Sequence, residues 1–565
     1  MVWTSPYPPV EVGGTTLHGM VLEAAARAGD RPALVDGASG TVVPYRLLAE
    51  RIQGVAAGLA ARGFAPGDVL ALWAPNLPQW AGVALGAMAA GGTVTGASPA
   101  ATEGELTTQL ADAGASVLVT VPSLVPAARS AAAAARVRDL VVLGQAEGAT
   151  PILDLLAAGT RAQPPGPAPD PRAPDPAAVA LLPYSSGTTG LPKGVELTHA
   201  NLVTSARQVA GGLRITGRDT VAAVAPFSHI MGFQVPLALP LSAGATVVTT
   251  PRFDPVRFLE LIERHRVTVL VGAPPMLRVL TAHPRAAGAD LSSLELVVCG
   301  GAALSAAAHE ALAARLPQAT VGQAWGLTET TVGLSCPDRA TGSVPGTVGR
   351  VLPNTELRVV DPATGRDLGP GEPGELLGRG PQVMAGYRNR PEATAAMVGP
   401  DGWLRTGDLG LVDADGNVVI VDRLKELIKV RGHQVAPAEL EALLATHPAV
   451  ADAAVLGRDD PDDGEVPVAV VVPRPGAGLD PAELLVWVAE RVAPHKRLRA
   501  VRFADAIPRT PSGKLLRRAL RDGVGDRPYD TGPTTPASGG SAPPVRIRAS
   551  SALSSLPTRM AMLEK

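Results

Sequence analysis

The sequence predicts an α/β protein, with a large N-terminal domain of mostly parallel sheets layered with helices, a small β-subdomain, and a small C-terminal α+β domain. Helix-like and strand-like segments alternate up to about Pro353, which is typical of parallel sheets covered by helices. Short strands with Asp-Gly and Thr-Gly turns follow, and helix–strand alternation returns after Asp422. A chain of 565 residues is also too long for one hydrophobic core.

The first elements follow from apolar spacing. Residues 45–63 carry apolar side chains at helical spacing and end in glycine, and residues 68–74 form an apolar run typical of a buried strand. Residues 105–114 and 116–121 repeat this helix–strand pair. Residues 80–97 are the most membrane-like stretch, but their Gly pairs and Thr residues favour a buried helix followed by a strand.

The pattern of expected elements changes in the second half of the chain. Strands with tight turns are expected within residues 356–368, 374–380 and 402–422. A small α/β unit follows, with its elements expected in residues 436–447, 450–457, 466–473 and 481–493.

Domain limits follow from these changes in pattern. We expect an N-terminal domain over residues 1–422, a C-terminal domain over 423–522, and a Gly/Pro/Ser/Thr-rich disordered tail over 523–565. The Pro-rich stretch 162–176 is expected to be a surface loop, because strand–helix alternation resumes after it.

Composition limits the partners and the compartment. The net charge of −2 gives no indication of nucleic acid or an anionic membrane as the main partner. The two cysteines, Cys299 and Cys336, lie far apart and form neither a metal motif nor a disulfide framework. The N-terminus lacks the layout of a signal peptide, so we expect a soluble, cytoplasmic protein without integral membrane contact.

The stretch YSSGTTGLPKGVELTH, residues 184–199, is the strongest local signal. It follows the apolar run Val179–Leu182 and precedes the helix-like stretch 201–210. We expect a hydroxyl-rich loop between strand and helix, whose backbone N–H groups and Lys193 could bind phosphate. It matches neither the P-loop nor the dinucleotide fingerprint, and a solvated surface turn is the alternative.

Five further segments carry residues of chemical interest. They are His229 in PFSHIMGF, Trp325, Thr328 and Glu329 in GQAWGLTETT, Asp408 in WLRTGDLG, the cations Arg423, Lys425, Lys429 and Arg431 in DRLKELIKVRGHQVAPAE, and Lys514 in PRTPSGKLLRR. Each has an ordinary explanation alone: a core histidine, a turn aspartate, a solvated basic helix face, or an exposed lysine.

Together, in this order, the segments resemble the adenylate-forming superfamily of acyl-CoA synthetases, peptide-synthetase adenylation domains and firefly-type luciferases. SSGTTGLPKG, IVDRLKELIKVRGHQVAPAELE and PRTPSGK are most similar to the coumarate–CoA ligase branch, and the resemblance covers roughly residues 15–520. It implies ATP, Mg²⁺ and coenzyme A, a small-molecule carboxylic acid, and a C-terminal domain that moves.

The resemblance also implies roles for individual residues. The loop would hold the β- and γ-phosphates through Ser185, Ser186, Gly187, Thr188, Thr189, Gly190 and Lys193. The rest of the nucleotide would contact Ala324, Trp325, Gly326, Leu327, Thr328, Asp408 and Arg423, and Thr188, Thr328 and Glu329 would help hold Mg²⁺. Trp325 would stack on adenine, where the family more often has tyrosine, so the shape of the adenine pocket stays open. Asp408 would accept hydrogen bonds from the ribose hydroxyls.

Two half-reactions are implied. A carboxylate is already ionised at pH 7 and needs no general base, only alignment on the α-phosphate and relief of charge repulsion. Lys514 would supply that relief. Rotation about the hinge Lys425 would then replace Lys514 by a loop that presents Lys429, Arg431, Gly432 and Gln434 to the pantetheine. His229 would shield the acyl carbonyl and gate the entry of CoA.

The motifs say less about which carboxylic acid is the substrate. The segment around His229 offers no acidic residue, which argues against an amino-acid substrate, and no carrier domain follows Lys514, which favours free CoA. The acyl pocket is expected to use His229, Met231, Phe233, Gly300, Ala302, Ala303, Gly326 and Val332. An aryl-propenoate of the cinnamate or 4-coumarate type is favoured by the branch resemblance. A medium- or long-chain fatty acid–CoA ligase, a fatty acyl-AMP ligase loading a separate acyl carrier protein, a luciferase-type oxygenase and a non-catalytic nucleotide-binding scaffold are the alternatives.

Overall fold

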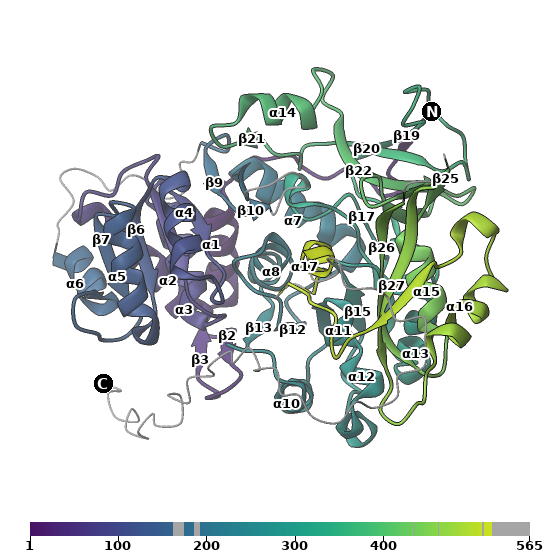
Figure 1. The fold of residues 1–565 in the computed structure, drawn as a ribbon. Coiled ribbons are helices and arrows are strands. Elements are labelled where there is room, and N and C mark those ends of the chain that lie inside the picture. The colour runs from purple at the N-terminus through teal and green to yellow at the C-terminus, as the bar shows by residue number, and fades with distance from the viewer. Residues whose placement is uncertain (162–174, 186–191, 432, 461–462, 511–512, 523–565) are drawn as a thin grey trace. The chain divides into compact units, whose positions relative to one another are not determined.

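The computed structural model describes residues 1–161, 175–185, 192–431, 433–460, 463–510 and 513–522 (Figure 1). Two large sheets form the first part of the chain. The first has the strand order β10-β11-β9-β5-β4-β6-β7-β8, with β21 also paired to β11. Its central strands β9, β5, β4, β6, β7 and β8 are parallel, and β10, β11 and β21 add antiparallel pairs at one end. The bounds are β4 Val69–Trp73, β5 Thr93–Gly96, β6 Ala115–Thr120, β7 Asp139–Val142, β8 Thr150–Pro151, β9 Val179–Leu181, β10 Tyr184–Ser185, β11 Lys193–Thr198 and β21 Gly386–Tyr387.

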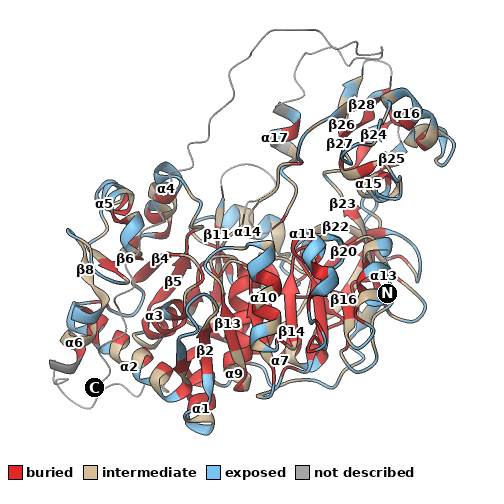
Figure 2. Ribbon diagram, turned by 90° about the horizontal axis from the view of Figure 1, so that it is seen from below, coloured by how far each residue is buried: buried red, intermediate tan, exposed pale blue. Residues whose placement is uncertain are grey.

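The second large sheet has the order β16-β15-β14-β12-β13-β2-β3 and is parallel except for the edge strand β3. Its strands are short apolar runs buried on both faces, as parallel sheets require (Figure 2). The bounds are β2 Pro32–Asp36, β3 Val42–Pro44, β12 Thr220–Ala223, β13 Thr246–Thr249, β14 Val269–Gly272, β15 Leu296–Cys299 and β16 Thr320–Gln323.

Helices join and cover these sheets. The α-helices are α1 Leu17–Ala28, α2 Tyr45–Ala61, α3 Pro78–Ala89, α4 Glu103–Ala113, α5 Val125–Ala134, α6 Ile152–Arg161, α7 His199–Leu213, α8 Ile230–Phe233, α9 Leu239–Ala243, α10 Pro255–His265, α11 Pro274–Leu277, α12 Val279–Ala282 and α13 Ala306–Arg315. Short helical turns are η1 Pro122–Leu124, η2 Gln234–Ala238, η3 Pro284–Gly288 and η4 Thr328–Thr330.

Trp80 of α3 packs where the two large sheets meet. It is 0% exposed, and its ring centroid lies 5.7 Å from that of Phe227 and 5.8 Å from that of Phe233, which both follow β12 of the second sheet. This arrangement confirms the prediction of a buried helix and a strand in residues 80–97. None of the described helices has the length and apolar character needed to cross a membrane.

The later part of the chain carries the predicted β-rich stretch and the small α/β unit. An antiparallel sheet has the order β1-β19-β20-β22-β23, and a second has the order β25-β24-β27-β26 with β28 parallel to β27. The bounds are β1 Val2–Thr4, β17 Ser335–Cys336, β18 Arg350–Val351, β19 Glu356–Val360, β20 Gly374–Arg379, α14 Pro391–Met397, β22 Leu404–Val412, β23 Val418–Arg423, β24 Ile428–Val430, β25 His433–Val435, α15 Pro437–Ala445, β26 Val450–Asp460, β27 Gly464–Pro473, α16 Pro481–Ala489, η5 Pro494–Lys496, β28 Ala500–Phe503 and α17 Arg517–Asp522.

The α/β fold class is confirmed, and two details differ from expectation. The stretch 184–199, expected to be a loop up to the next helix, contains the strand β11 before α7 begins, because Val195 and Leu197 alternate with polar residues and are buried on one face. The strand β1 also joins the β-rich sheet, by pairing Val2 with Arg358. The loop expected at 162–176 lies almost wholly, and the tail over 523–565 entirely, outside the described residues.

Candidate active site

The predicted phosphate loop closes a hairpin. Ser185 ends β10, Lys193 begins β11, and the two residues are cross-strand partners. Residues 186–191, and with them Ser186, Gly187, Thr188, Thr189 and Gly190, lie outside the described residues. The Nζ atom of Lys193 lies 5.0 Å from the ring centroid of Tyr387, over the ring face.

The turn η4 presents Glu329 near that lysine. Glu329 is 5% exposed, and its Oε1 accepts a hydrogen bond of 2.7 Å from the hydroxyl of Tyr387. Its backbone carbonyl accepts the N–H of Met384 at 2.9 Å. Leu327 and Thr328 belong to the same turn. The N–H of Ala324 donates a hydrogen bond to the carbonyl of Cys299, at the end of β15.

Trp325, Asp408 and Arg423 form one hydrogen-bonded group. The indole Nε1 of Trp325 donates to Asp408 Oδ2 at 2.8 Å, and Arg423 Nε lies 3.0 Å from Asp408 Oδ1. Asp408 and Arg423 are cross-strand partners in β22 and β23, which fixes their separation. Burial raises the pKa of Asp408, while the Arg423 charge and the indole N–H oppose that rise. Each carboxylate oxygen retains a second lone pair, which a ribose hydroxyl can use.

The charge of Lys514 interacts with the charges of Asp408 and Arg423. Burial lowers the pKa of its ammonium and the Arg423 charge lowers it further, while Glu426, Asp408 and Glu329 oppose the shift. The preceding Gly513, at φ +85°, approaches Ala273 so closely that an added Cβ would lie 2.5 Å from the alanine Cβ. The structure therefore places the Lys514 loop against the carboxyl end of β14.

His229 begins the helix α8, where its Nδ1 accepts the N–H of Met231 at 3.3 Å. Burial lowers the pKa of His229 to about 4, and the Lys514 charge contributes to that shift. The imidazole is therefore neutral at pH 7. A neutral imidazole suits a pocket wall and does not add a second positive charge to that of Lys514.

A buried asparagine that the sequence analysis missed holds the segment leading to His229. Asn76 follows β4, and its side chain donates to the carbonyls of Ala223 and Ala225 and accepts the N–H of Phe227 at 2.9 Å. A polar residue three positions after a buried strand was the available signal.

Apart from His229, the predicted acyl-pocket residues fall into two contacting pairs and three others. A Cβ on Gly300 would lie 2.8 Å from Met231 Sδ, and a Cβ on Gly326 would lie 2.2 Å from the carbonyl oxygen of Val332. Val332 has φ +88°, a strained conformation for a β-branched residue. Phe233 is buried against Trp80, Ala302 is half-buried and its carbonyl accepts a weak bond from Cys299 Sγ, and Ala303 is exposed.

The residues expected to serve the second half-reaction lie on β24, β25 and the turn between them. Lys429 is exposed and pairs with Gln434 across these strands, while Gly432 lies outside the described residues. Arg431 is ion-paired with Asp463, which is 5% exposed on its side chain and also binds Arg499 at 2.6 Å. At the predicted hinge, burial lowers the pKa of Lys425 to about 8, with Arg423 and Lys514 adding to the effect.

Two further observations concern ligands. No cluster of three or more His, Cys, Asp or Glu side chains suited to a metal occurs in the part of the chain that the structure describes. Glu329 alone nevertheless fits Mg²⁺, which keeps several waters and is commonly bound by one or two carboxylates plus substrate phosphates.

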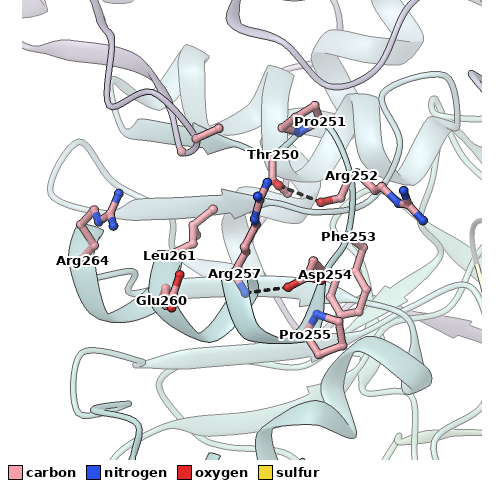
Figure 3. Close-up of a pocket in the computed structure, with 12 residues that line it drawn as sticks. Thr250, Pro251, Arg252, Phe253, Asp254, Pro255, Arg257, Glu260, Leu261 and Arg264 are labelled. Atoms are coloured by element: carbon pink, nitrogen blue, oxygen red, sulfur yellow. Dashed lines mark hydrogen bonds between the residues drawn. The ribbon is translucent and has the colours of Figure 1, made fainter. Parts of the chain in front are cut away.

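A cavity of about 760 Å³ lies elsewhere, at the ends of β2 and β13 beside α10. It is lined by Gly37, Ala38, Thr250, Pro251, Arg252, Phe253, Asp254, Pro255, Arg257, Glu260, Leu261 and Arg264. The side chains of Arg252 and Arg264 lie at opposite sides of it (Figure 3). None of the predicted site residues lines this cavity, so it is separate from the candidate site.

Comparisons with known proteins identify the family. The AMP-binding enzyme family matches residues 21–388, and the AMP-binding enzyme C-terminal domain matches residues 439–514. The chain is 42% identical to 4-coumarate–CoA ligase 5 of Oryza sativa subsp. japonica over 514 residues, which cover 89% of this chain and 94% of the relative. It is 38% identical to 4-coumarate–CoA ligase 2 of Nicotiana tabacum over 513 residues, covering 89% and 94% of the two chains.

Solved structures give the same result. ATP-bound MatB from Rhodopseudomonas palustris matches with a TM-score of 0.81 and 31% identity, over 90% of this chain and 99% of that one. The anthranilate CoA ligase AuaEII in complex with anthranoyl-AMP matches with a TM-score of 0.82 and 25% identity, over 90% and 97%. The chain therefore belongs to the AMP-binding enzyme family, as an AMP-forming acid–thiol ligase.

Proposed function

We propose that the chain activates a cinnamate- or 4-coumarate-type acid with ATP, forming acyl-AMP and pyrophosphate, and then transfers the acyl group to CoA with release of AMP. The curated relatives in Oryza and Nicotiana are named for the coumarate reaction, which supports this choice of acid. The Met231 and Val332 side chains and the small residues Gly300 and Gly326 would form a largely apolar acyl pocket.

The observation that carries the proposal is the place of the Lys514 loop, whose Gly513 lies against Ala273 at the end of β14. The Lys514 charge contributes to the pKa shifts of His229 and Asp408. The ammonium would lie between the carboxylate and the α-phosphate and offset the repulsion between two anions. One unit charge at ~4 Å with an effective dielectric of ~20 contributes about 4 kcal/mol, on the order of 10³ in rate. Asp408 would hold the ribose, and Trp325 would face the adenine.

Several finer assignments belong to the same proposal. Glu329, with Thr188 and Thr328, would hold a Mg²⁺ ion that offsets phosphate charge when bound. Lys429, Arg431, Gly432 and Gln434 would face the pantetheine after rotation of a C-terminal domain that begins at residue 423. We propose a cytoplasmic location, from the two unpaired cysteines, and free CoA as the acceptor in preference to a carrier protein.

A pyrophosphate-release screen tests the proposal. Purified protein is supplied with ATP, Mg²⁺ and one acid at a time from cinnamate, 4-coumarate, benzoates and fatty acids, with and without CoA, and products are identified by mass. We expect the highest kcat/KM with an aryl-propenoate and thioester formation only when CoA is present. A preference for fatty acids, or acyl-AMP that CoA cannot discharge, would overturn the assignment of the acid or of the acceptor, respectively.

A further inference from the structure

The short strand β21 links two parts of the candidate site that are distant in sequence. It pairs with β11 through Val195↔Tyr387 and Glu196↔Gly386, directly after Lys193. The preceding residue Met384 donates its N–H to the carbonyl of Glu329. The backbone therefore holds one segment against both the phosphate-loop strand and the turn η4.

Tyr387 occupies the centre of this link. Its hydroxyl donates to Glu329 Oε1 at 2.7 Å, and its ring face lies under the Nζ of Lys193 at 5.0 Å. The side chain is buried, with 8% of the residue exposed. One aromatic residue therefore contacts both the candidate acid and the candidate phosphate-binding cation.

The two contacts have different physical effects. The hydrogen bond from the phenol fixes which oxygen of the Glu329 carboxylate faces the protein, so Oε2 of Glu329 is left for a ligand. The cation–π contact restricts the long, flexible side chain of Lys193. Burial and the neighbouring Glu329 charge raise the pKa of the Tyr387 phenol, which therefore remains a donor at neutral pH.

We propose that Tyr387 is a positioning residue for ATP: its hydroxyl orients Glu329 toward the metal that accompanies the phosphates, and its ring directs Lys193 toward the phosphates themselves. The inference rests on the proposed function, because it assumes that Glu329 and Lys193 face the triphosphate. Tyr387 itself does not touch the reacting atoms.

Two substitutions separate the two contacts. Tyr387→Phe removes the hydroxyl and keeps the ring, whereas Tyr387→Leu removes both. Tyr45→Phe is the matched control, because Tyr45 is also a buried tyrosine whose hydroxyl is bonded, to the carbonyls of Ala245 at 2.7 Å and Leu241 at 3.1 Å. Melting temperatures of all three establish that the variants are folded.

The decisive measurement is ligand binding by calorimetry, using AMP and the non-hydrolysable α,β-methylene analogue of ATP with and without Mg²⁺. Tyr387→Phe should reduce the Mg²⁺-dependent gain in affinity for the analogue about tenfold, with AMP affinity within about twofold. Tyr387→Leu should also weaken binding of the analogue without Mg²⁺. Tyr45→Phe should change none of these affinities, and both Tyr387 variants should convert supplied acyl-AMP to thioester at near wild-type rate.

A Tyr387→Phe protein with unchanged Mg²⁺ dependence would overturn the inference. A parallel loss of AMP affinity would also overturn it, because AMP lacks the β- and γ-phosphates and such a loss indicates a general packing role. Failure of the proposed function would give another result, because the wild-type protein would then form no acyl-AMP from any acid. The binding measurements test the role of Tyr387 separately from that activity.

Discussion

The carboxylate of Asp408 accepts hydrogen bonds from two other predicted nucleotide-site residues before any ribose is considered. The indole N–H of Trp325 contacts one oxygen and Arg423 the other. A phenyl ring at position 325 would keep an aromatic platform but lose the donor. The hydrogen bond to Asp408 is therefore separable from the adenine stacking proposed for Trp325.

We expect Trp325→Phe to weaken AMP binding about five- to tenfold, because Asp408 loses one of the groups that orient it. AMP affinity measured by calorimetry checks this result. Trp487→Phe on α16 is the control and should leave AMP affinity unchanged. Wild-type AMP affinity in the Trp325 variant would show that stacking alone determines the role of residue 325.

His199, at the start of α7, should make the free energy of unfolding depend on pH. Burial lowers the pKa of His199 to about 3, with a further contribution from His18, whose ring centroid lies 5.2 Å away. The unfolded chain binds a proton there below its ordinary pKa of about 6.5, whereas the folded protein does not. The free energy of unfolding should therefore fall as pH falls from about 6.5 toward 3.

We expect His199→Gln to flatten this dependence by up to about 1.4 kcal/mol per pH unit. Urea unfolding of wild type and variant between pH 7 and pH 4 provides the comparison, and carboxylates common to both proteins cancel in the difference. Parallel stability curves would contradict the assignment of this proton to His199.

At the scale of elements, the end of β5 in the first sheet touches the loop after β12 in the second. A Cβ on Gly96 would lie 2.7 Å from the Cα of Ser228, next to His229. Gly96→Ala should cost about 1–3 kcal/mol of stability through overpacking and should lower kcat/KM. The measurements are urea unfolding and the pyrophosphate-release rate.

Gly104→Ala is the matched control for this substitution. A Cβ at Gly104, in the first turn of α4, would meet nothing within 4 Å. It should leave activity unchanged and shift stability by no more than about 1 kcal/mol, in the stabilising direction. Equal effects at the two glycines would show that the contact between the sheets is not tight.

Local patterns predicted most of the elements, because apolar runs and turn residues report burial and chain reversal directly. The helix and strand within residues 80–97 were predicted from Gly pairs and Thr residues in an apolar stretch, and the strands β19, β20, β22 and β23 from short segments bounded by tight turns. The strand β11 was missed because the glycines and hydroxyls of residues 185–190 dominated the interpretation of the whole stretch, although Val195 and Leu197 carry the alternation of a strand.

The candidate site was predicted from motif residues, but the contacts among them were not. Tyr387 meets a partner 58 positions away in sequence, through pairing of a two-residue strand, and two residues carry no periodicity. The Trp325–Asp408 bond likewise joins residues 83 positions apart. Such contacts depend on tertiary packing, which a single sequence does not display.

For the whole molecule, the two lysines should separate the half-reactions. Lys514→Ala should nearly abolish acyl-AMP formation, because the charge between carboxylate and α-phosphate is lost, and should still convert supplied acyl-AMP to thioester. Lys429→Ala should form acyl-AMP and pass it slowly to CoA. Pyrophosphate release and thioester formation are measured separately on each variant.

The geometric reason is that one small domain cannot present both loops to one site at once. Lys514 contributes to the electrostatic environment of His229 and Asp408, whereas Lys429 is exposed on β24. Loss of both steps in equal proportion in both variants would contradict a rotating C-terminal domain.

Asp463 anchors the loop that carries Arg431 to the rest of the same domain. Its buried carboxylate is shared by Arg431 and Arg499, one on each oxygen. Because Arg431, Asp463 and Arg499 all lie within residues 423–522, a rotation of that domain would carry both ion pairs with it and break neither. The loop around Arg431 would therefore reach the site already anchored, and no buried carboxylate would be left without a cation.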